Sequence, residues 1–315
     1  RSHPKWREVV LPLAQKLIES LTQYYQMLNN LEIDFKCLDH DRLHEQTKNI
    51  RLDIQALALR LEKATALLSQ FFTPCQNNVK VRWIENQALK AWSNVLLIDA
   101  DLDVSKALVG FLFEKFPTVV LCSATLTSNQ KFDFIRQRLG LTSELLPHRS
   151  IAEHIYDSPF NYREQALLAV PTDMPPPQHP DFQEIAFENI WKAIEACRGQ
   201  AFVLFTSYAM LRQCSERLGE RLEAHGYSLF KQGEDPRQGL LQKFKNTRGA
   251  VLFGTDSFWE GVDVIGDALR CVIIVKLPFK VPNEPIIQAR TEAIKESGGD
   301  PFFEYAIPQA VVKFK

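Results

Sequence analysis

Two amphipathic stripes occupy the first seventy positions of the chain. Apolar residues recur there at spacings of three and four, the pattern of one helix face. The stripes are Val10, Leu13, Leu17, Leu21, Tyr24 and Leu28, then Ile50, Ile54, Leu57, Leu61, Ala64, Leu68 and Phe71. A polar stretch with Asp39, His40 and Asp41 separates them. The pattern predicts an αα-hairpin of long helices, and nothing in it indicates a cofactor.

From Val79 onward, short β-branched runs alternate with helical stretches. We predict strands at 118–122, 201–205, 228–230, 250–253 and 271–275, with helices between them. Continuous apolar strands separated by helices are typical of a parallel sheet covered on both faces. The proline-rich stretch from Met174 to Pro180 is expected to be an extended surface loop. The fold class is therefore α/β.

Composition narrows the functional classes only a little. The net charge is -1, so any basic surface for nucleic acid must be local. No apolar run has transmembrane length, so we expect no membrane partner and a cytoplasmic location. The cysteines are scattered and fit neither a zinc nor an iron–sulfur site, which favours reduced thiols. They are Cys37, Cys75, Cys122, Cys197, Cys214 and Cys271.

Small hydroxyl residues follow three of the predicted strands. They are Ser123 and Thr125, Thr206 and Ser207, and Thr255 and Ser257. In open α/β sheets, ligands bind beyond the carboxyl ends of the strands. A single Ser or Thr at such a junction is usually a helix cap. Three at equivalent ends favour a surface that faces phosphate groups.

The run from Gly254 to Asp263 combines three acids, two aromatic residues and two glycines. Gly261 would let the backbone approach a ligand. Glu260 and Asp263 could bond a ribose hydroxyl or pair with an arginine, although Asp263 could equally be a turn former. Core packing explains Phe258 well, and it explains Trp259 about as well as base stacking does.

Several catalytic signatures are absent from the sequence. It has no GxxxxGK[ST] loop to hold phosphates and no Asp-Glu pair at a strand end. Asp99, Asp101 and Asp103 lack the glycine and the terminal glutamate of a calcium loop, so we expect a solvated turn and no metal site. A self-contained ATPase or hydrolase is therefore disfavoured.

Three of these stretches resemble motifs of the DinG/XPD branch of superfamily 2 DNA helicases. Ser123–Leu126 resembles motif III, Phe202–Tyr208 resembles motif IV, and Phe253–Asp263 resembles motif V, the most specific match. Lys231–Gly233 and Leu277–Pro282 are similar to other recurrent stretches of these proteins. The resemblance runs from about Trp83 to the last residue.

The resemblance implies an order of domains. Residues 1–80 would be a helical hairpin left from the arch insertion, and 81–152 the end of the first RecA-like motor domain with motif III. Residues 153–315 would be the second RecA-like motor domain, the helicase C-terminal domain, ending before the arginine of motif VI. The chain starts without methionine and stops within an expected helix, so we expect a fragment. The parts that hold most of ATP and Mg²⁺, and an iron–sulfur cluster in members that carry one, would lie upstream.

The implied activity is that of an ATP-dependent, monomeric motor moving 5′ to 3′ along single-stranded DNA. Ser123 and Thr125 would couple the ATP state to the grip on DNA. Glu260, Gly261 and Asp263 would face the nucleotide, with Asp263 at its ribose. The residues implied to lie near DNA are Thr206, Ser207, Arg237, Thr255 and Ser257, of which Arg237 could equally be a solvated surface residue. The alternative is a non-enzymatic α/β module that binds nucleic acid or docks a protein through its hairpin.

Overall fold

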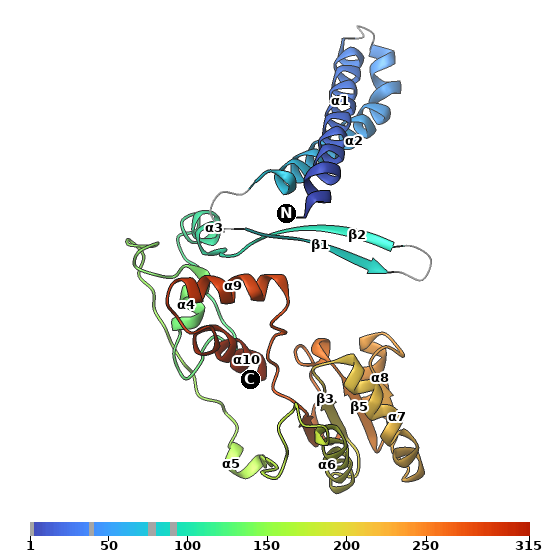
Figure 1. The fold of residues 1–315 in the computed structure, drawn as a ribbon, viewed down its shortest axis with the longest axis vertical. Helices are drawn as coiled ribbons and strands as arrows, with labels where there is room; N and C mark the ends of the chain where they lie inside the picture. Colours follow the sequence, from blue (N-terminus) through green and yellow to red (C-terminus); the bar gives the residue numbers. More distant parts are fainter. Residues whose placement is uncertain (1–2, 38–40, 75–79, 89–92) are drawn as a thin grey trace. The chain divides into compact units, whose positions relative to one another are not determined.

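The structure, a computed structural model, describes residues 3–37, 41–74, 80–88 and 93–315 (Figure 1). The chain divides into two compact units. One comprises Arg1–Asp103 with Gln288–Arg290, and the other comprises Val104–Ile287 with Thr291–Lys315. The three-part division at residues 80 and 152 stays a prediction.

The first unit opens with the predicted helical hairpin. A π-helical turn (Trp6–Val10) leads into α1 (Leu11–Lys36), which packs along α2 (Asp41–Phe72). Asp39 and His40 of the expected turn lie outside the described residues. Three residues of the apolar stripe of α1, Leu13, Leu17 and Tyr24, are 59%, 49% and 61% exposed.

The face of α1 that is actually buried includes Ala14 and Glu32. The Glu32 carboxylate accepts hydrogen bonds from Lys36 Nζ (2.9 Å) and from the side-chain amide of Gln55 in α2. Apolar residues lie on more than one side of α1, so spacing alone could not choose the side that meets α2. The buried positions of α1 are instead a small residue, Ala14, and a polar one, Glu32.

An antiparallel pair of strands follows, β1 (Lys80–Ala88) and β2 (Ser93–Asp101). The expected solvated turn at Asp99 and Asp101 is wrong, because both residues lie in β2. Asp99 is paired with Arg82 (3.2 Å) and Lys80 (3.7 Å), and Asp101 with Lys80 (3.5 Å). Cross-strand pairing of opposite charges accounts for Asp99 and Asp101.

The predicted strand at 118–122 does not form. A strand needs a neighbour to take its backbone hydrogen bonds, and none of the described strands pairs with this stretch. Val120 is 82% exposed. Around it lie α3 (Ser105–Leu108), a π-helical turn (Val109–Phe113) and α4 (Asp133–Leu139), with Val109, Phe113 and Leu146 forming a small apolar cluster.

The core of the second unit is a four-stranded parallel sheet of order β4-β5-β3-β6. The strands are β3 (Ala201–Leu204), β4 (Ser228–Lys231), β5 (Ala250–Gly254) and β6 (Cys271–Ile274). The helices that pack against the sheet are α6 (Phe182–Ala196), α7 (Tyr208–Ala224) and α8 (Arg237–Asn246). Four predicted strands and the α/β class are confirmed.

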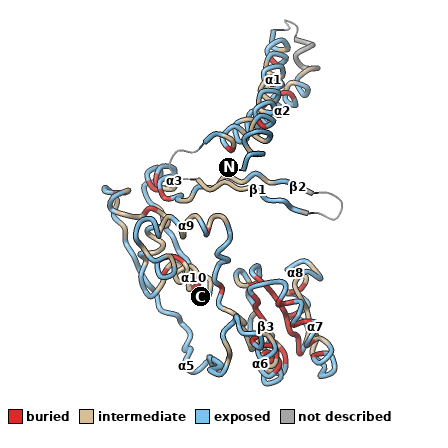
Figure 2. The backbone as a smooth tube through the Cα atoms, viewed as in Figure 1, coloured by how far each residue is buried: buried red, intermediate tan, exposed pale blue. Residues whose placement is uncertain are grey.

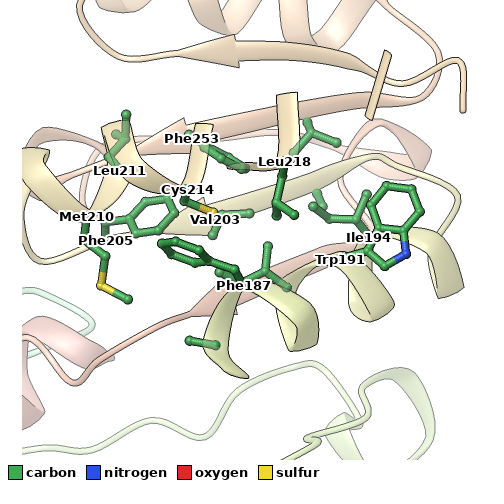
Figure 3. Packing of buried hydrophobic residues seen from close by; sticks show 14 of the residues in the cluster. Phe187, Trp191, Ile194, Val203, Phe205, Met210, Leu211, Cys214, Leu218 and Phe253 are labelled. Carbon is green, nitrogen blue, oxygen red and sulfur yellow. The ribbon is translucent and has the colours of Figure 1, made fainter. Parts of the chain in front are cut away.

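Strand side chains alternate between two apolar layers. Val203 and Phe205 pack against α6 and α7, whereas Phe202 and Leu204 pack against α8. Figure 3 shows Phe187, Trp191 and Ile194 on the first layer with the strand residues. Buried positions are concentrated on this sheet and its helices (Figure 2). Burial on both faces explains why these strands read as continuous apolar runs.

The remaining helices are α5 (Tyr162–Gln165), α9 (Pro285–Glu296) and α10 (Ile307–Phe314), which follows a π-helical turn (Phe302–Ala306). The stretch from Met174 to Pro180 contains no helix or strand and precedes α6, as expected of the proline-rich loop. Among the described helices, none has the combined length and apolar character needed to cross a membrane.

Candidate functional site

The candidate site lies at the carboxyl edge of the four-stranded sheet. Leu204 pairs in register with Gly254 and Ile274, and Lys231 pairs with Phe253. Because the strands are parallel, the segments that follow them emerge on one edge. These segments are Thr206–Tyr208 after β3, Gln232 after β4, Thr255–Asp263 after β5 and Leu277–Pro282 after β6.

The segment after β3 presents three hydroxyl groups at the start of α7. Thr206, Ser207 and Tyr208 are all exposed. The Ser207 side chain accepts the backbone N–H of Met210 at 3.3 Å, so it caps α7. The cap uses an oxygen lone pair and leaves the hydroxyl hydrogen available to another acceptor.

Thr206 also lines a cavity of about 210 Å³. Its wall includes Trp259 from the segment after β5 and Phe279 and Lys280 from the segment after β6. Lys280 is exposed and supplies a positive charge near the hydroxyls. The cavity wall therefore combines aromatic surface and a hydroxyl group with two lysines, Lys280 and Lys313, and two acids, Asp256 and Glu284.

Gln232 connects the segments after β4 and β5. Its Oε1 accepts the backbone N–H of Thr255 (2.7 Å) and the Thr255 hydroxyl (3.0 Å). Its Nε2 donates to the Ser257 hydroxyl (3.0 Å) and to the Tyr208 hydroxyl. One side-chain amide thus ties together two of the expected hydroxyl residues and the first residue of α7.

Arg237, at the start of α8, holds the loop after β5 from the side. Its Nη2 donates to the backbone carbonyl of Gly261 (2.8 Å) and to that of Glu260. Gly261 has φ +64°, a conformation that favours glycine. The guanidinium therefore fixes the shape of the loop that carries the two expected acids.

The two aromatic residues of this loop are structural anchors. Phe258 is buried among the residues of the α8-facing layer. Trp259 is partly buried against the same layer, and its Nε1 donates to the carbonyl of Phe205 (3.4 Å). Packing explains both positions, and the exposed part of Trp259 forms cavity wall.

An ion pair joins the loop to α10. Lys313 contacts the carboxylate of Asp256, and both line the cavity. Burial lowers the pKa of the Lys313 ammonium. A partly buried cation thus faces an exposed carboxylate at the mouth of the site.

Ser123 and Thr125 lie in a loop of the same unit. The two hydroxyl oxygens are 3.1 Å apart, and the Thr125 backbone N–H donates to Ser123 Oγ (3.2 Å). This is a local turn. That Ser123 shares one cleft with Thr206, Thr255 and Asp263 stays a prediction.

Glu260 and Asp263 are exposed. Their carboxylates could accept hydrogen bonds from sugar hydroxyls. Within the described ranges, no three His, Cys, Asp or Glu side chains gather where they could hold a metal ion.

Sequence reasoning missed the roles of Gln232, Tyr208 and Lys280. All three stand in stretches that resemble helicase sequences, yet none had a function assigned. A glutamine just after a buried strand is a signal that could have been used, because its amide can bridge a donor and an acceptor. Lys280 and Thr206 line the same cavity only because of the tertiary structure.

Comparison with known proteins agrees with this geometry. Residues 190–315 match the family model of the helicase C-terminal domain. The chain is 42% identical over 196 residues to ATP-dependent DNA helicase YoaA of Haemophilus influenzae. This alignment covers 62% of this chain and 29% of that protein. It is 35% identical over 239 residues to 3'-5' exonuclease DinG of Bacillus subtilis, covering 74% of this chain and 25% of that protein.

A third relative aligns with nearly the whole chain. ATP-dependent DNA helicase DinG of Photobacterium profundum is 31% identical over 315 residues, covering 95% of this chain and 43% of that protein. The chain thus spans less than half the length of these relatives. The chain is therefore similar to part of the DinG-like helicases, and residues 190–315 match their helicase C-terminal domain.

Proposed function

We propose that the chain carries the second motor domain of an ATP-dependent DNA helicase that moves 5′ to 3′ along single-stranded DNA. The names of two of the relatives, each an ATP-dependent DNA helicase, support this activity. The motor would work as a monomer in the cytoplasm, in DNA repair or replication.

The observation that carries the proposal is the row of hydroxyl groups at one edge of the sheet. Thr206 and Ser207 follow β3, Ser257 follows β5, and all three are exposed. Neutral hydroxyl donors suit the backbone phosphates of a strand whose sequence is not read, because they fix position without contacting bases. A motor that steps along any sequence needs this kind of grip.

ATP hydrolysis would supply the energy for movement. This chain's part in the nucleotide site would be Asp263, accepting a hydrogen bond from a ribose hydroxyl, with Glu260 and Gly261 beside it. The sequence offers no loop for the phosphates and no acidic pair for Mg²⁺. Ser123 and Thr125 would transmit the nucleotide state to the DNA grip.

Fluorescence anisotropy with an oligothymidylate at several salt concentrations tests the DNA part of the proposal. We expect binding that weakens as salt rises, as phosphate-dominated binding does. Thr206→Ala should weaken it about fivefold, the value of one hydrogen bond. Thr247→Ala is the matched control, because Thr247 precedes β5 at the opposite edge. Absence of binding at low salt would overturn the proposal.

A phosphate-release assay tests whether this chain holds only part of the ATP site. We expect background hydrolysis of ATP by the 315-residue chain, with or without DNA. Robust DNA-stimulated hydrolysis would show that the chain itself holds a complete ATP site. The claim that Asp263 only assists nucleotide binding would then fail.

One observation favours a second candidate, a protein-docking module. The hairpin of α1 and α2 exposes large apolar side chains, among them Leu17, Met27 and Leu57. Exposed apolar rows of this kind mark contact surfaces. In this alternative, Thr255→Ala with Asp263→Ala leaves DNA binding unchanged, while Leu17→Ser with Met27→Ser abolishes binding to a protein partner.

A further inference from the structure

The hydrogen bonds of Gln232 decide which hydroxyl groups at the sheet edge can donate. A backbone N–H can only donate, so the amide atom facing Thr255 N must be the oxygen Oε1. The nitrogen Nε2 then faces Ser257 and Tyr208 and gives one hydrogen to each hydroxyl oxygen. The orientation of the amide is therefore fixed by the main chain.

The same logic separates Thr255 from the other two residues. The Thr255 hydroxyl donates its only hydrogen to Gln232 Oε1, and Thr255 is 5% exposed. Ser257 and Tyr208 accept from Gln232, so each keeps its own hydroxyl hydrogen. Both residues are exposed, Tyr208 by 48%. Within the described part of the chain, neither hydroxyl donates to a protein acceptor.

We propose that Gln232 is a positioning residue that presents the Tyr208 and Ser257 hydroxyls as a pair of donors to one backbone phosphate of single-stranded DNA. The inference rests on the proposed function. Thr255 holds the Gln232 amide in place, and Ser257 makes the phosphate contact. Two donors bound to the same nitrogen lie close enough to reach two oxygens of a single phosphate group.

Phosphate is the ligand that this pair selects. A phosphate oxygen only accepts hydrogen bonds, and each hydroxyl of the pair keeps a hydrogen to donate to it. Lys280, at the neighbouring cavity beside Thr206, adds an exposed positive charge to the same edge of the sheet. The hydroxyl pair itself carries no charge, which gives it a signature distinct from that of Lys280.

Oligothymidylate binding by the full chain and its variants tests the proposal. Ser257→Ala and Tyr208→Phe each remove one donor, and each should weaken binding about fivefold. Gln232→Ala should weaken it about tenfold, because both hydroxyls lose their orientation. Gln238→Ala, a glutamine exposed on α8, is the matched control and should bind as the wild type does.

Two readouts distinguish positioning from a merely structural role. Removing neutral donors should leave the slope of log affinity against log salt unchanged, whereas Lys280→Gln should reduce its magnitude by about 0.7. Gln232→Ala should also cost much less in a background that already carries Ser257→Ala with Tyr208→Phe, because it acts through those groups.

The outcomes separate this inference from the proposed function. A wild-type chain that binds no single-stranded DNA overturns the function. Binding that is lowered by Lys280→Gln but untouched by Ser257→Ala and Tyr208→Phe overturns the hydroxyl pair and leaves the function standing. Full additivity of Gln232→Ala with the double variant overturns the positioning role, as does a loss of thermal stability with unchanged affinity.

Discussion

Arg237 and Gly261 are joined by a hydrogen bond of 2.8 Å from the guanidinium to the backbone carbonyl, across 24 positions of sequence. The same nitrogen reaches the carbonyl of Glu260. An arginine from α8 thus supports the loop after β5, although the family resemblance pointed to it as a DNA contact. A charged donor satisfies two carbonyls that the turn at Gly261 leaves without a regular partner.

Arg237→Ala should therefore loosen the loop. The arginine is exposed, so the loss in unfolding free energy should be only about 1 kcal/mol, but the amides of residues 256–263 should exchange faster with deuterium. Arg237→Lys keeps the charge yet cannot reach both carbonyls as a planar fork does, so it should not restore protection. Arg212→Ala on α7 is the control.

The salt dependence of DNA binding gives the contrary outcome for Arg237. If its guanidinium is committed to the two carbonyls, Arg237→Ala leaves the salt slope unchanged. A slope reduced by about 0.7 would assign Arg237 to a DNA phosphate.

The sheet was predictable because its strands are buried on both faces. Four continuous apolar runs became β3 to β6 in the expected places. The run at 118–122 has the same texture and forms no strand, because strand formation requires a neighbour and sequence texture does not supply one. The spacing also could not show which side of α1 meets α2, because periodicity shows a face and packing chooses among faces.

The residues of the candidate site could be predicted from the sequence, but the hydrogen bonds between them could not. Hydroxyl residues at strand ends could be read from Thr206 and Ser257, since parallel strands deliver their carboxyl ends to one edge. The amide of Gln232 meets Thr255 across 23 positions. Such contacts are set by the order of strands in the sheet, which the sequence does not display.

Gly254 allows Phe258 to pack against the end of β5. A Cβ added at Gly254 would lie 2.8 Å from the Phe258 Cβ, closer than such atoms approach. Gly254→Ala should therefore lower the free energy of unfolding by about 1–3 kcal/mol through overpacking. Urea denaturation followed by circular dichroism measures the change.

Gly219→Ala is the control for that substitution. Gly219 lies within α7, and an added Cβ there meets no atom within 4 Å. Alanine should stabilise the helix by about 0.5–1 kcal/mol. Equal destabilisation by the two substitutions would contradict the packing role of Phe258.

Glu32 should make the helical hairpin sensitive to acid. Hydrogen bonds from Lys36 and Gln55 lower the pKa of the Glu32 carboxyl from its ordinary value of 4.5. A lowered folded-state pKa means that the stabilisation is present above the unfolded-state value and is lost as pH falls through the folded-state value. Urea midpoints measured between pH 6 and pH 3 should fall less for Glu32→Gln than for wild type. Glu19→Gln, exposed on the same helix, should behave as wild type.

Cys214 reports on the packing of α7 against the sheet. It has no exposed surface and lies between the helix and the strands (Figure 3), and burial raises the pKa of its thiol. The thiolate is the reactive form, so both access and ionisation are suppressed.

Cys37 and Cys122 are exposed and should be alkylated first under native conditions. Pulsed alkylation with mass spectrometry should find Cys214 slower by about a hundredfold or more, since it must wait for the sheet and its helix to open. In strong denaturant the three rates should converge, and native labelling of Cys214 as fast as Cys122 would mean that the α7 layer is not closed.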